Sequence, residues 1–270
     1  MSNDTGEIKP RWAYDRTRRL KLQTGTVLVY SDAHYWPGDP RTPAFKALLK
    51  LCAVMKPKIV IANGDLMDGA KISRHARIGW SKNPSVKSEL NLVQARQREI
   101  EDAAGRAVLV RTVGNHDVRL DNYLAQNAPE VEDVAGTRLA HYLPRWPESW
   151  SVHINDDFLA KHRLRGGIHA AWNNVQAAGM HIATSHTHRL VVRSFRGYRS
   201  NAHYGVETGT LGNAPQDVDD AGSGPGEYGE DSPAPHTSGF MVLTWLRGRL
   251  LPPEPCAVDD GVAYFRGAKV

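Results

Sequence analysis

The chain carries the stretch TVLVYSDAH at residues 26–34, in which an apolar, β-branched run passes directly into a polar segment. The run 26–30 predicts a buried strand that ends at Ser31-Asp32. The same pattern recurs at 59–68, where IVIA precedes NGDLMD, and at 108–117, where VLVRT precedes VGNHD. Strands that each end in carboxylates, amides or imidazoles predict a sheet with polar chemistry along one edge.

Helical patterns separate these three strands. Apolar residues recur at helical spacing over 43–55, and Pro57 ends that helix. A second helix is expected from about 89 to 104, with Gly105 as its stop. The β-α-β-α-β order predicts a parallel-rich sheet with helices on both of its faces.

The second half of the chain predicts a more antiparallel unit. A short helix should follow Asp117, and the turn 155–157 should join two short strands into a hairpin. Further elements are expected at 168–178 (helix), 181–184, 190–195 and 239–246 (strands). We expect one domain over 26–270 behind a basic N-terminal segment, 1–25, with a basic insertion at 69–88 and a flexible loop at 213–238.

The composition fits a globular α/β domain. Of the 270 residues, 41% are hydrophobic and 23% are charged, and no apolar run approaches the length of a membrane span. The polar residues 1–19 lack the apolar stretch of a signal peptide. Cys52 and Cys256 are too few for a disulfide framework, so a reducing, cytoplasmic setting is expected. The net charge of +5 is a weak indication of an anionic partner.

A fourth polar segment follows the strand expected at 181–184. Together the four segments supply six candidate ligands: Asp32, His34, Asp65, Asn115, His186 and His188. Residues two apart in an extended segment point to the same side, which would pair Asp32 with His34 and His186 with His188. Carboxylates, an amide oxygen and imidazoles suit a two-metal hydrolytic centre.

These segments resemble the calcineurin-like metallophosphoesterase superfamily. Its pattern is Asp-x-His, Gly-Asp-x-x-Asp, Gly-Asn-His-Asp/Glu, a lone His and Gly-His-x-His. The likeness spans about 27–190 and implies an α/β fold, a four-layer α-β-β-α sandwich of two mixed sheets flanked by helices. His162 is favoured as the lone histidine, with His169 and His153 as competitors. The chain departs from the pattern at Arg163, where small residues are common, and at Ser185, which replaces a glycine.

The resemblance also implies roles for individual residues. One divalent ion would be held by Asp32, His34, Asp65 and His188, and the other by Asp65, Asn115, His162 and His186. A hydroxide that bridges the two metals would attack phosphorus. His116 would protonate the leaving oxygen, Asp117 would orient His116, and Asp68 would support His34 or a water. The metals would be Mn, Fe, Zn or Ni, with Mn the ion expected to support activity in vitro.

The substrate is less constrained. Phosphoprotein phosphatases of this group usually continue Gly-Asp-x-x-Asp with Arg-Gly, whereas this chain has Gly69-Ala70. The stretch 69–88 contains no acidic residue. Candidate substrate-binding residues are Arg74, Arg77 and Trp80 in that stretch, with Arg119 and Arg163. A generic basic surface would explain the stretch equally.

Three functions remain open from the sequence. The leading one is hydrolysis of a nucleotide or nucleic-acid phosphodiester. The alternatives are a phosphomonoesterase, which includes phosphoprotein phosphatases, and a non-catalytic metal-binding or interaction module. The continuation 117–120 resembles small phosphoesterases often encoded by bacteriophages, for which the cytoplasm would be that of the host. No membrane partner is expected, and the oligomeric state is open.

Overall fold

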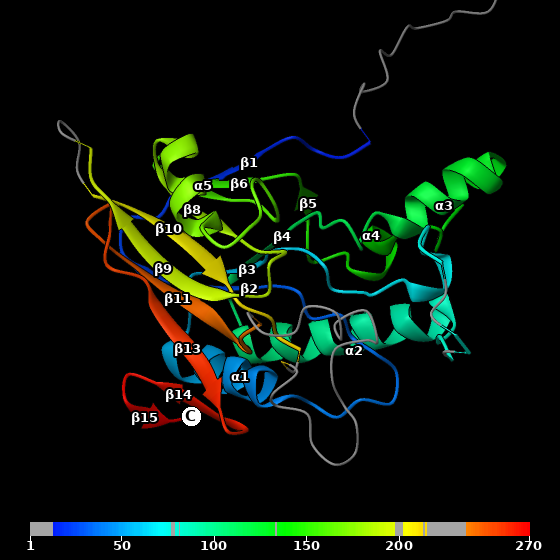
Figure 1. Ribbon diagram of the computed structural model, residues 1–270, viewed down its shortest axis with the longest axis horizontal. Helices are drawn as coiled ribbons and strands as arrows, with labels where there is room; N and C mark the ends of the chain where they lie inside the picture. The colour runs from blue at the N-terminus through cyan, green and yellow to red at the C-terminus, as the bar shows by residue number, and fades with distance from the viewer. Residues whose placement is uncertain are drawn as a thin grey trace, which may run out of the picture.

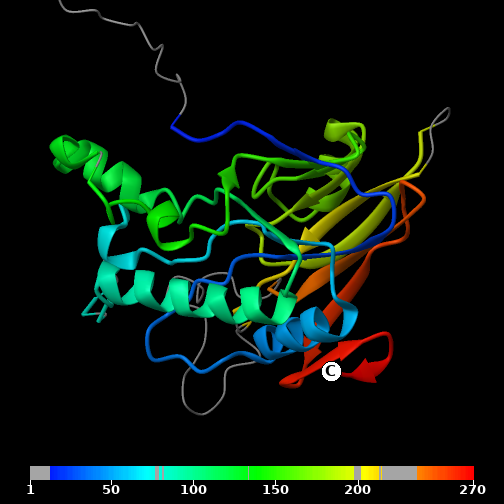
Figure 2. The same ribbon diagram turned by 180° about the vertical axis from the view of Figure 1, so that it is seen from behind.

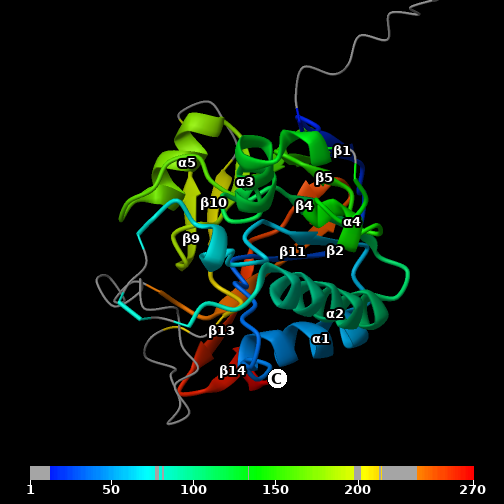
Figure 3. The ribbon, with the colours of Figure 1, turned by 90° about the vertical axis from the view of Figure 1, so that its right-hand side faces the viewer.

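The computed structural model describes residues 13–76, 79–80, 82–132, 134–197, 202–212, 214 and 236–270. Two mixed sheets pack face to face, and helices cover their outer faces (Figure 1, and Figure 3 from the side). The four-layer α-β-β-α arrangement expected from the sequence is confirmed. The figures show α1 and α2 on one outer face and α5 on the other.

The first sheet has nine strands and carries three of the polar segments. Its order is β15 (Ala268–Lys269), β14 (Val262–Phe265), β13 (Glu254–Asp259), β11 (Gly239–Leu246), β2 (Gly25–Tyr30), β3 (Ile59–Ala62), β4 (Val108–Thr112) and β5 (Glu148–Ser149), and β12 (Arg249–Leu250) pairs with β11. Strands β2 to β5 are parallel, and β11 is antiparallel to β2. The predicted β-α-β-α-β unit is therefore present.

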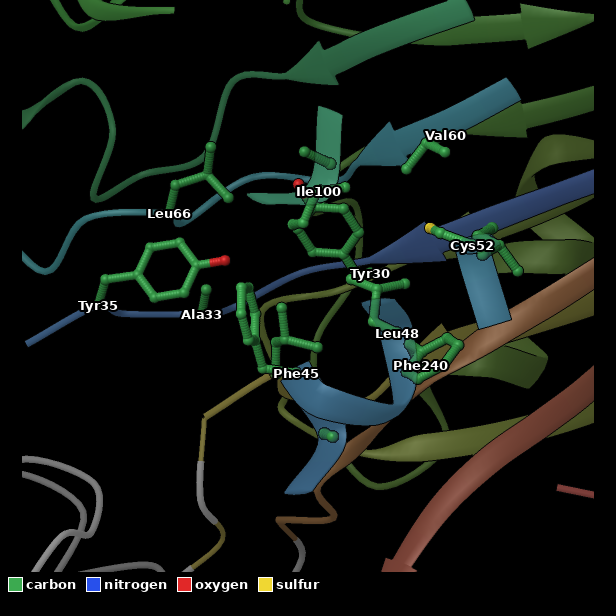
Figure 4. Packing of buried hydrophobic residues seen from close by; sticks show 14 of the residues in the cluster. Tyr30, Ala33, Tyr35, Phe45, Leu48, Cys52, Val60, Leu66, Ile100 and Phe240 are labelled. Carbon is green, nitrogen blue, oxygen red and sulfur yellow. The ribbon is translucent and has the colours of Figure 1, made fainter. Parts of the chain in front are cut away.

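Two helices pack on one face of this sheet (Figure 2). Helix α1 (Pro43–Met55) begins at Thr42, whose side chain accepts a hydrogen bond from the Phe45 amide. Helix α2 (Val86–Ala104) begins earlier than predicted, because the Ser85 side chain caps it. Tyr30 and other β2 and β3 side chains meet these helices in a buried cluster (Figure 4).

The other face of the nine-stranded sheet packs against the second sheet, not against helices as the β-α-β pattern alone predicted. Leu28 and Tyr30 lie in the cluster under the helices, whereas Val27 and Val29 lie in the cluster between the sheets. Since both faces are buried, the strand is a continuous apolar run. Such a run does not show whether a helix or a sheet covers each face.

The second sheet has six strands, in the order β1 (Arg18–Leu20), β6 (Val152–Ile154), β7 (Phe158–Ala160), β8 (His181–Thr184), β10 (His203–Thr208) and β9 (Leu190–Phe195). Strands β6 and β7 form the predicted antiparallel hairpin. Helix α5 (Ala170–Ala178) lies on the outer face, so close that a Cβ on Gly205 would be 2.0 Å from the Ala171 carbonyl oxygen. Strand β1 lies within the predicted N-terminal segment and pairs with β6.

The remaining elements are short. They are η1 (Ala70–Ile72), α3 (Arg119–Asn127), η2 (Pro129–Val131) and α4 (Leu139–Tyr142). The sequence did not predict α4, β1, β10 or the C-terminal strands β12 to β15. Most of the predicted loop 213–238 lies outside the described residues. None of the helices in the described part combines the length and apolar composition that a bilayer crossing requires.

Candidate metal centre

The polar segments that follow β2, β3, β4 and β8 meet at one edge of the two sheets. Backbone hydrogen bonds join the first two, from Asp32 N to Gly64 O (3.0 Å) and from His34 N to Asp65 O (3.2 Å). The fourth joins the first through His186 N, which donates to Asp32 Oδ2 over 3.1 Å. The second sheet thus adds its segment to an edge formed by the first sheet.

Five of the candidate ligands have a left-handed backbone. The φ angles are 49° at Asp32, 40° at His34, 55° at Asp65, 74° at His186 and 56° at His188. Non-glycine residues rarely adopt this region, and such strain concentrates at functional sites. The extended geometry expected from the two-residue spacing is therefore absent. Asp32 and His34 converge because the chain turns sharply at both residues.

Asp32, His34 and His188 form a first donor group. The two imidazole Nε2 atoms lie 3.3 Å apart, and Asp32 Oδ1 is 3.3 Å from His188 Nε2. Asp32 is fully buried, and none of the described residues donates a hydrogen bond to its Oδ1. Burial raises the pKa of Asp32, but the charge of the neighbouring His188 imidazole outweighs it and lowers the pKa to about 2. A buried, ionised oxygen beside two imidazole nitrogens suits a divalent cation.

Asp65, His162 and His186 form a second donor group. His162 Nε2 lies 3.1 Å from Asp65 Oδ2 and 3.1 Å from Asn115 Oδ1. Its other ring nitrogen, Nδ1, donates to the Asn63 carbonyl over 2.8 Å, which directs Nε2 toward the other donors. Of the competing histidines, His153 lies within β6, and His169 is exposed before α5. Among the three, only His162 belongs to a donor group.

Two glycines make room for these donors. A Cβ on Gly114 would lie 2.1 Å from Asp65 Oδ1, and a Cβ on Gly64 would lie 2.5 Å from His162 Nδ1. Gly64 also has a φ of +87°, which side chains rarely tolerate. The glycines of both motifs are therefore required by close approach to the donors.

His116 contacts Asp68, and these two residues form a third donor group with His34. Its Nδ1 is 2.8 Å from the Asp68 carbonyl oxygen and 3.3 Å from Asp68 Oδ1. Asp68 Oδ1 is also 3.4 Å from His34 Nδ1. Arg119 donates to the same Asp68 carbonyl over 2.7 Å, and its Nη2 lies 3.2 Å from His116 Nε2. Burial lowers the pKa of His116, but the nearby carboxylates of Asp68 and Asp65 raise it above its ordinary value.

Asp117 has a different set of contacts from the one expected. Its two oxygens accept hydrogen bonds from the backbone amides of Asp65 (3.0 Å), Leu66 (2.9 Å) and Gly114 (3.0 Å). These contacts hold the second and third polar segments together. The carboxylate and carbonyl that contact the His116 ring come from Asp68, because the turn after Gly114 directs Asp117 toward the backbone of the neighbouring loop.

A buried polar network, which no motif of the sequence indicates, lies under the donors. Asn63 Nδ2 donates to Ser185 Oγ over 2.6 Å, and Thr112 Oγ1 donates to Asn63 Oδ1 over 2.8 Å. The Thr208 hydroxyl lies 2.8 Å from Ser185 Oγ and 2.7 Å from Ser31 Oγ. The network joins strand ends of both sheets, and it gives Ser185, which departs from the family pattern, a structural role.

Glu89 on α2 anchors the loop that carries Asp68. Its Oε2 accepts from the amides of Gly69 (2.6 Å) and Asp68 (3.2 Å), and the residue is fully buried. Burial raises the pKa of Glu89 to about 7. His236 also lies near the centre, with its ring centroid 4.6 Å from that of His188. Neither residue belongs to a motif of the chain.

The candidate substrate-binding residues are less closely grouped. Arg119 lies beside His116, and Arg163 directly follows His162 with an exposed side chain. Arg74 is exposed, Trp80 is 99% exposed, and Arg77 lies outside the described residues. Of the four candidates that the structure describes, Arg119 contacts a predicted catalytic residue, His116.

Comparison with known proteins identifies the family. No curated protein matches the chain. Among solved structures, a single mutant of Vps29 from Entamoeba histolytica is 14% identical with a TM-score of 0.46, over 91% of this chain and 99% of that one. The nuclease MPE from Pseudomonas putida is 15% identical with a TM-score of 0.32, over 84% of this chain and 86% of that one. Both scores are low, so the assignment depends on the family profile, which matches residues 25–202. Because this match covers more than half of its length, the chain belongs to the calcineurin-like phosphoesterase family.

Proposed function

We propose that this chain is a binuclear metal-dependent phosphoesterase whose substrate is a nucleotide or nucleic-acid phosphodiester. The observation that carries the proposal is the pair of donor groups, Asp32–His34–His188 and Asp65–His162–His186, at one edge of the fold. Every donor of the family pattern is retained, which argues against a non-catalytic module.

The donor sets fit two divalent ions. Asp32, His34, Asp65 and His188 would hold one, and Asp65, Asn115, His162 and His186 the other, with Mn as the ion to test first. Bound ions would supply an activated water and would neutralise charge on the phosphate oxygens. The fit rests on the buried Asp32 Oδ1, to which none of the described residues donates a hydrogen bond, and on the convergence of imidazole nitrogens upon it.

The chain's own residues would bind the phosphate and move the proton. Because His116 Nδ1 faces the Asp68 carbonyl, His116 Nε2 is the atom available to protonate the leaving oxygen. Arg119 lies beside that nitrogen, where its guanidinium can bind a phosphate oxygen. Asp68 would position His116 and His34, and Asp117 would hold the Asp65 loop.

A diester of nucleic-acid type is supported by charge and by exposure. The stretch 69–88 contains no acidic residue and begins directly after Asp68. Arg74 and the almost fully exposed Trp80 offer a cation and an aromatic face. A phosphomonoester is the second candidate, because Arg119 would bind the terminal phosphate equally. The two buried thiols, Cys52 and Cys256, suit a reducing cytoplasm.

The test is hydrolysis by the purified protein with Mn²⁺ and with EDTA. The substrates are bis-p-nitrophenyl phosphate, p-nitrophenyl phosphate, single-stranded DNA and a phosphopeptide. We expect metal-dependent hydrolysis of the diesters to exceed that of the monoesters. A preference for the monoesters would make a phosphomonoester, not a diester, the substrate class. Inactivity on all four substrates despite two bound ions would favour the binding-module alternative.

A further inference from the structure

A second acid-free stretch runs from the metal centre along the outer layer of the six-stranded sheet. Residues 158–206 contain no aspartate or glutamate, although they include arginines at 163, 165, 189, 193 and 196. This stretch contributes His162, His186 and His188 to the donor groups and also forms α5 and β9. A polyanion that reaches the centre along this layer would meet no carboxylate of the stretch.

The side chains at the surface combine cations with an aromatic face. Trp172 on α5 is 41% exposed and meets Phe195 of β9 edge-on, with ring centroids 5.4 Å apart. Leu190 and Val192 pack toward the space between the sheets, so the alternation of β9 places Arg193 on the same side as Phe195. We define the α5–β9 surface as Arg163, Arg165, Trp172, Arg193 and Phe195. Its three arginines are exposed.

The loop that carries two of these arginines is fixed to the fold. The buried Asn174 side chain accepts from the Arg165 amide over 3.0 Å and donates to the Arg165 carbonyl over 3.1 Å. Arg189 donates to the carbonyls of Gly167 and Ile168. Asp157 and Glu207 flank the stretch in the sequence, and Glu207 is buried and faces Arg189 over 3.7 Å. Glu207 therefore pairs with Arg189 inside the protein and does not neutralise the three arginines of the α5–β9 surface.

We infer that the α5–β9 surface binds single-stranded nucleic acid and leads it to the metal centre. Arginines track a phosphate backbone, and an exposed indole stacks on an unpaired base, which a duplex does not offer. Charge complementarity selects a polyanion over an apolar or basic partner, and Trp172 selects a single strand over a duplex. Arg163 directly follows His162, so this path ends at the second donor group. The inference deepens the proposed function, on which it rests, by naming the substrate.

Binding is measured without hydrolysis, as fluorescence anisotropy of a labelled oligothymidylate of about 20 nucleotides in EDTA. Trp172→Ala should weaken binding about 5- to 100-fold, whereas Trp172→Phe should keep most of it. Arg193→Glu should weaken binding and reduce its salt dependence. The matched control is Lys50→Glu, an exposed cation on α1 at the opposite outer layer, which should bind like the wild type.

The inference is overturned if Trp172→Ala and Arg193→Glu both bind within about twofold of the wild type, or if a duplex of equal length competes as well as the single strand. Circular dichroism checks that the variants are folded. Hydrolysis of bis-p-nitrophenyl phosphate by the wild type separates the two proposals. Activity without strand binding removes this inference alone, and strand binding without activity removes the proposed function alone.

Discussion

The metal centre and the stretch 69–88 differ in how their side chains are held. At the centre, the donors contact one another and the backbone, as when Asp65 faces His162 with one oxygen and accepts from the His116 amide with the other. In the stretch 69–88, Trp80 is 99% exposed. The centre is therefore defined by specific contacts and tolerates few substitutions, whereas the stretch 69–88 is defined only by its charge and composition. The reaction is accordingly easier to infer than the substrate.

The largest effect is expected at Asp65, which belongs to both proposed metal sites. Asp65→Asn removes the buried negative charge beside His162, so the two ions lose their shared ligand. We expect metal content and hydrolysis to fall together below detection, measured by elemental analysis and with bis-p-nitrophenyl phosphate. Asp102→Asn, at an exposed position on α2, is the control. Full metal loading in the Asp65 variant would contradict the assignment.

A second test compares two glycines. Gly114→Ala would place a Cβ 2.1 Å from Asp65 Oδ1 and 2.3 Å from Asp65 N, whereas nothing lies within 4 Å of a Cβ on Gly166. We expect Gly114→Ala to weaken metal binding at least about 100-fold, because it displaces a ligand. Gly166→Ala should match the wild type in metal titration and thermal unfolding. Equal behaviour of the two variants would show that the loops yield more readily than the contacts imply.

His116→Ala separates proton transfer from metal binding. The ring contacts Asp68 and Arg119 and is not among the proposed ligands, so both ions should remain bound. Turnover should fall about 10²- to 10⁴-fold on substrates with poor leaving groups, and less on nitrophenyl esters, which need no protonation. The comparison requires kcat for both substrate types at equal metal content. Loss of metal in this variant would make His116 a ligand or a support for one.

The sequence predicted which residues lie together better than the backbone geometry that brings them together. The six pattern residues and His162 all lie in or beside the two donor groups, because each follows a buried strand whose apolar run is visible in the sequence. The left-handed φ angles at Asp32 and His34 were not predictable, because they depend on the neighbouring loop, to which His34 donates a backbone hydrogen bond. The contacts of Asp117 depend on that neighbouring loop in the same way.

The same limit applies to the fold. Strands β2, β3 and β4 were predicted because they are buried on both faces. Strand β10 was missed because its sequence, HYGVET, contains a glycine and a glutamate. Gly205 permits α5 to approach, and Glu207 pairs inside the protein. Both residues look unsuited to a strand until their neighbours in space are known.

A smaller effect is expected at Ser185, which lies below the donors. Ser185→Ala removes the hydroxyl that accepts from Asn63 Nδ2, which keeps its longer bond to the Lys161 carbonyl, so the free energy of unfolding should fall by about 0.5–1.5 kcal/mol. Metal content should be retained, since Ser185 contacts none of the proposed ligands through its hydroxyl. Chemical denaturation of the metal-free protein measures the cost. An unchanged midpoint would show that the network contributes specificity of packing rather than stability.

The smallest effect is expected at Trp80, and it tests the basic stretch itself. Because the side chain is 99% exposed, Trp80→Ala should change the free energy of unfolding by less than about 0.5 kcal/mol. If Trp80 stacks on a base, Trp80→Ala should raise KM for a single-stranded substrate about 5- to 100-fold. KM for bis-p-nitrophenyl phosphate, which offers no base, should stay unchanged. Equal KM values for wild type and variant on the polymer would leave the stretch 69–88 as an ordinary solvated surface. The comparison with Trp172→Ala then decides which side of the centre the strand occupies. Removing an indole that stacks on a base raises KM for the single-stranded substrate, whereas removing one that does not stack leaves KM unchanged.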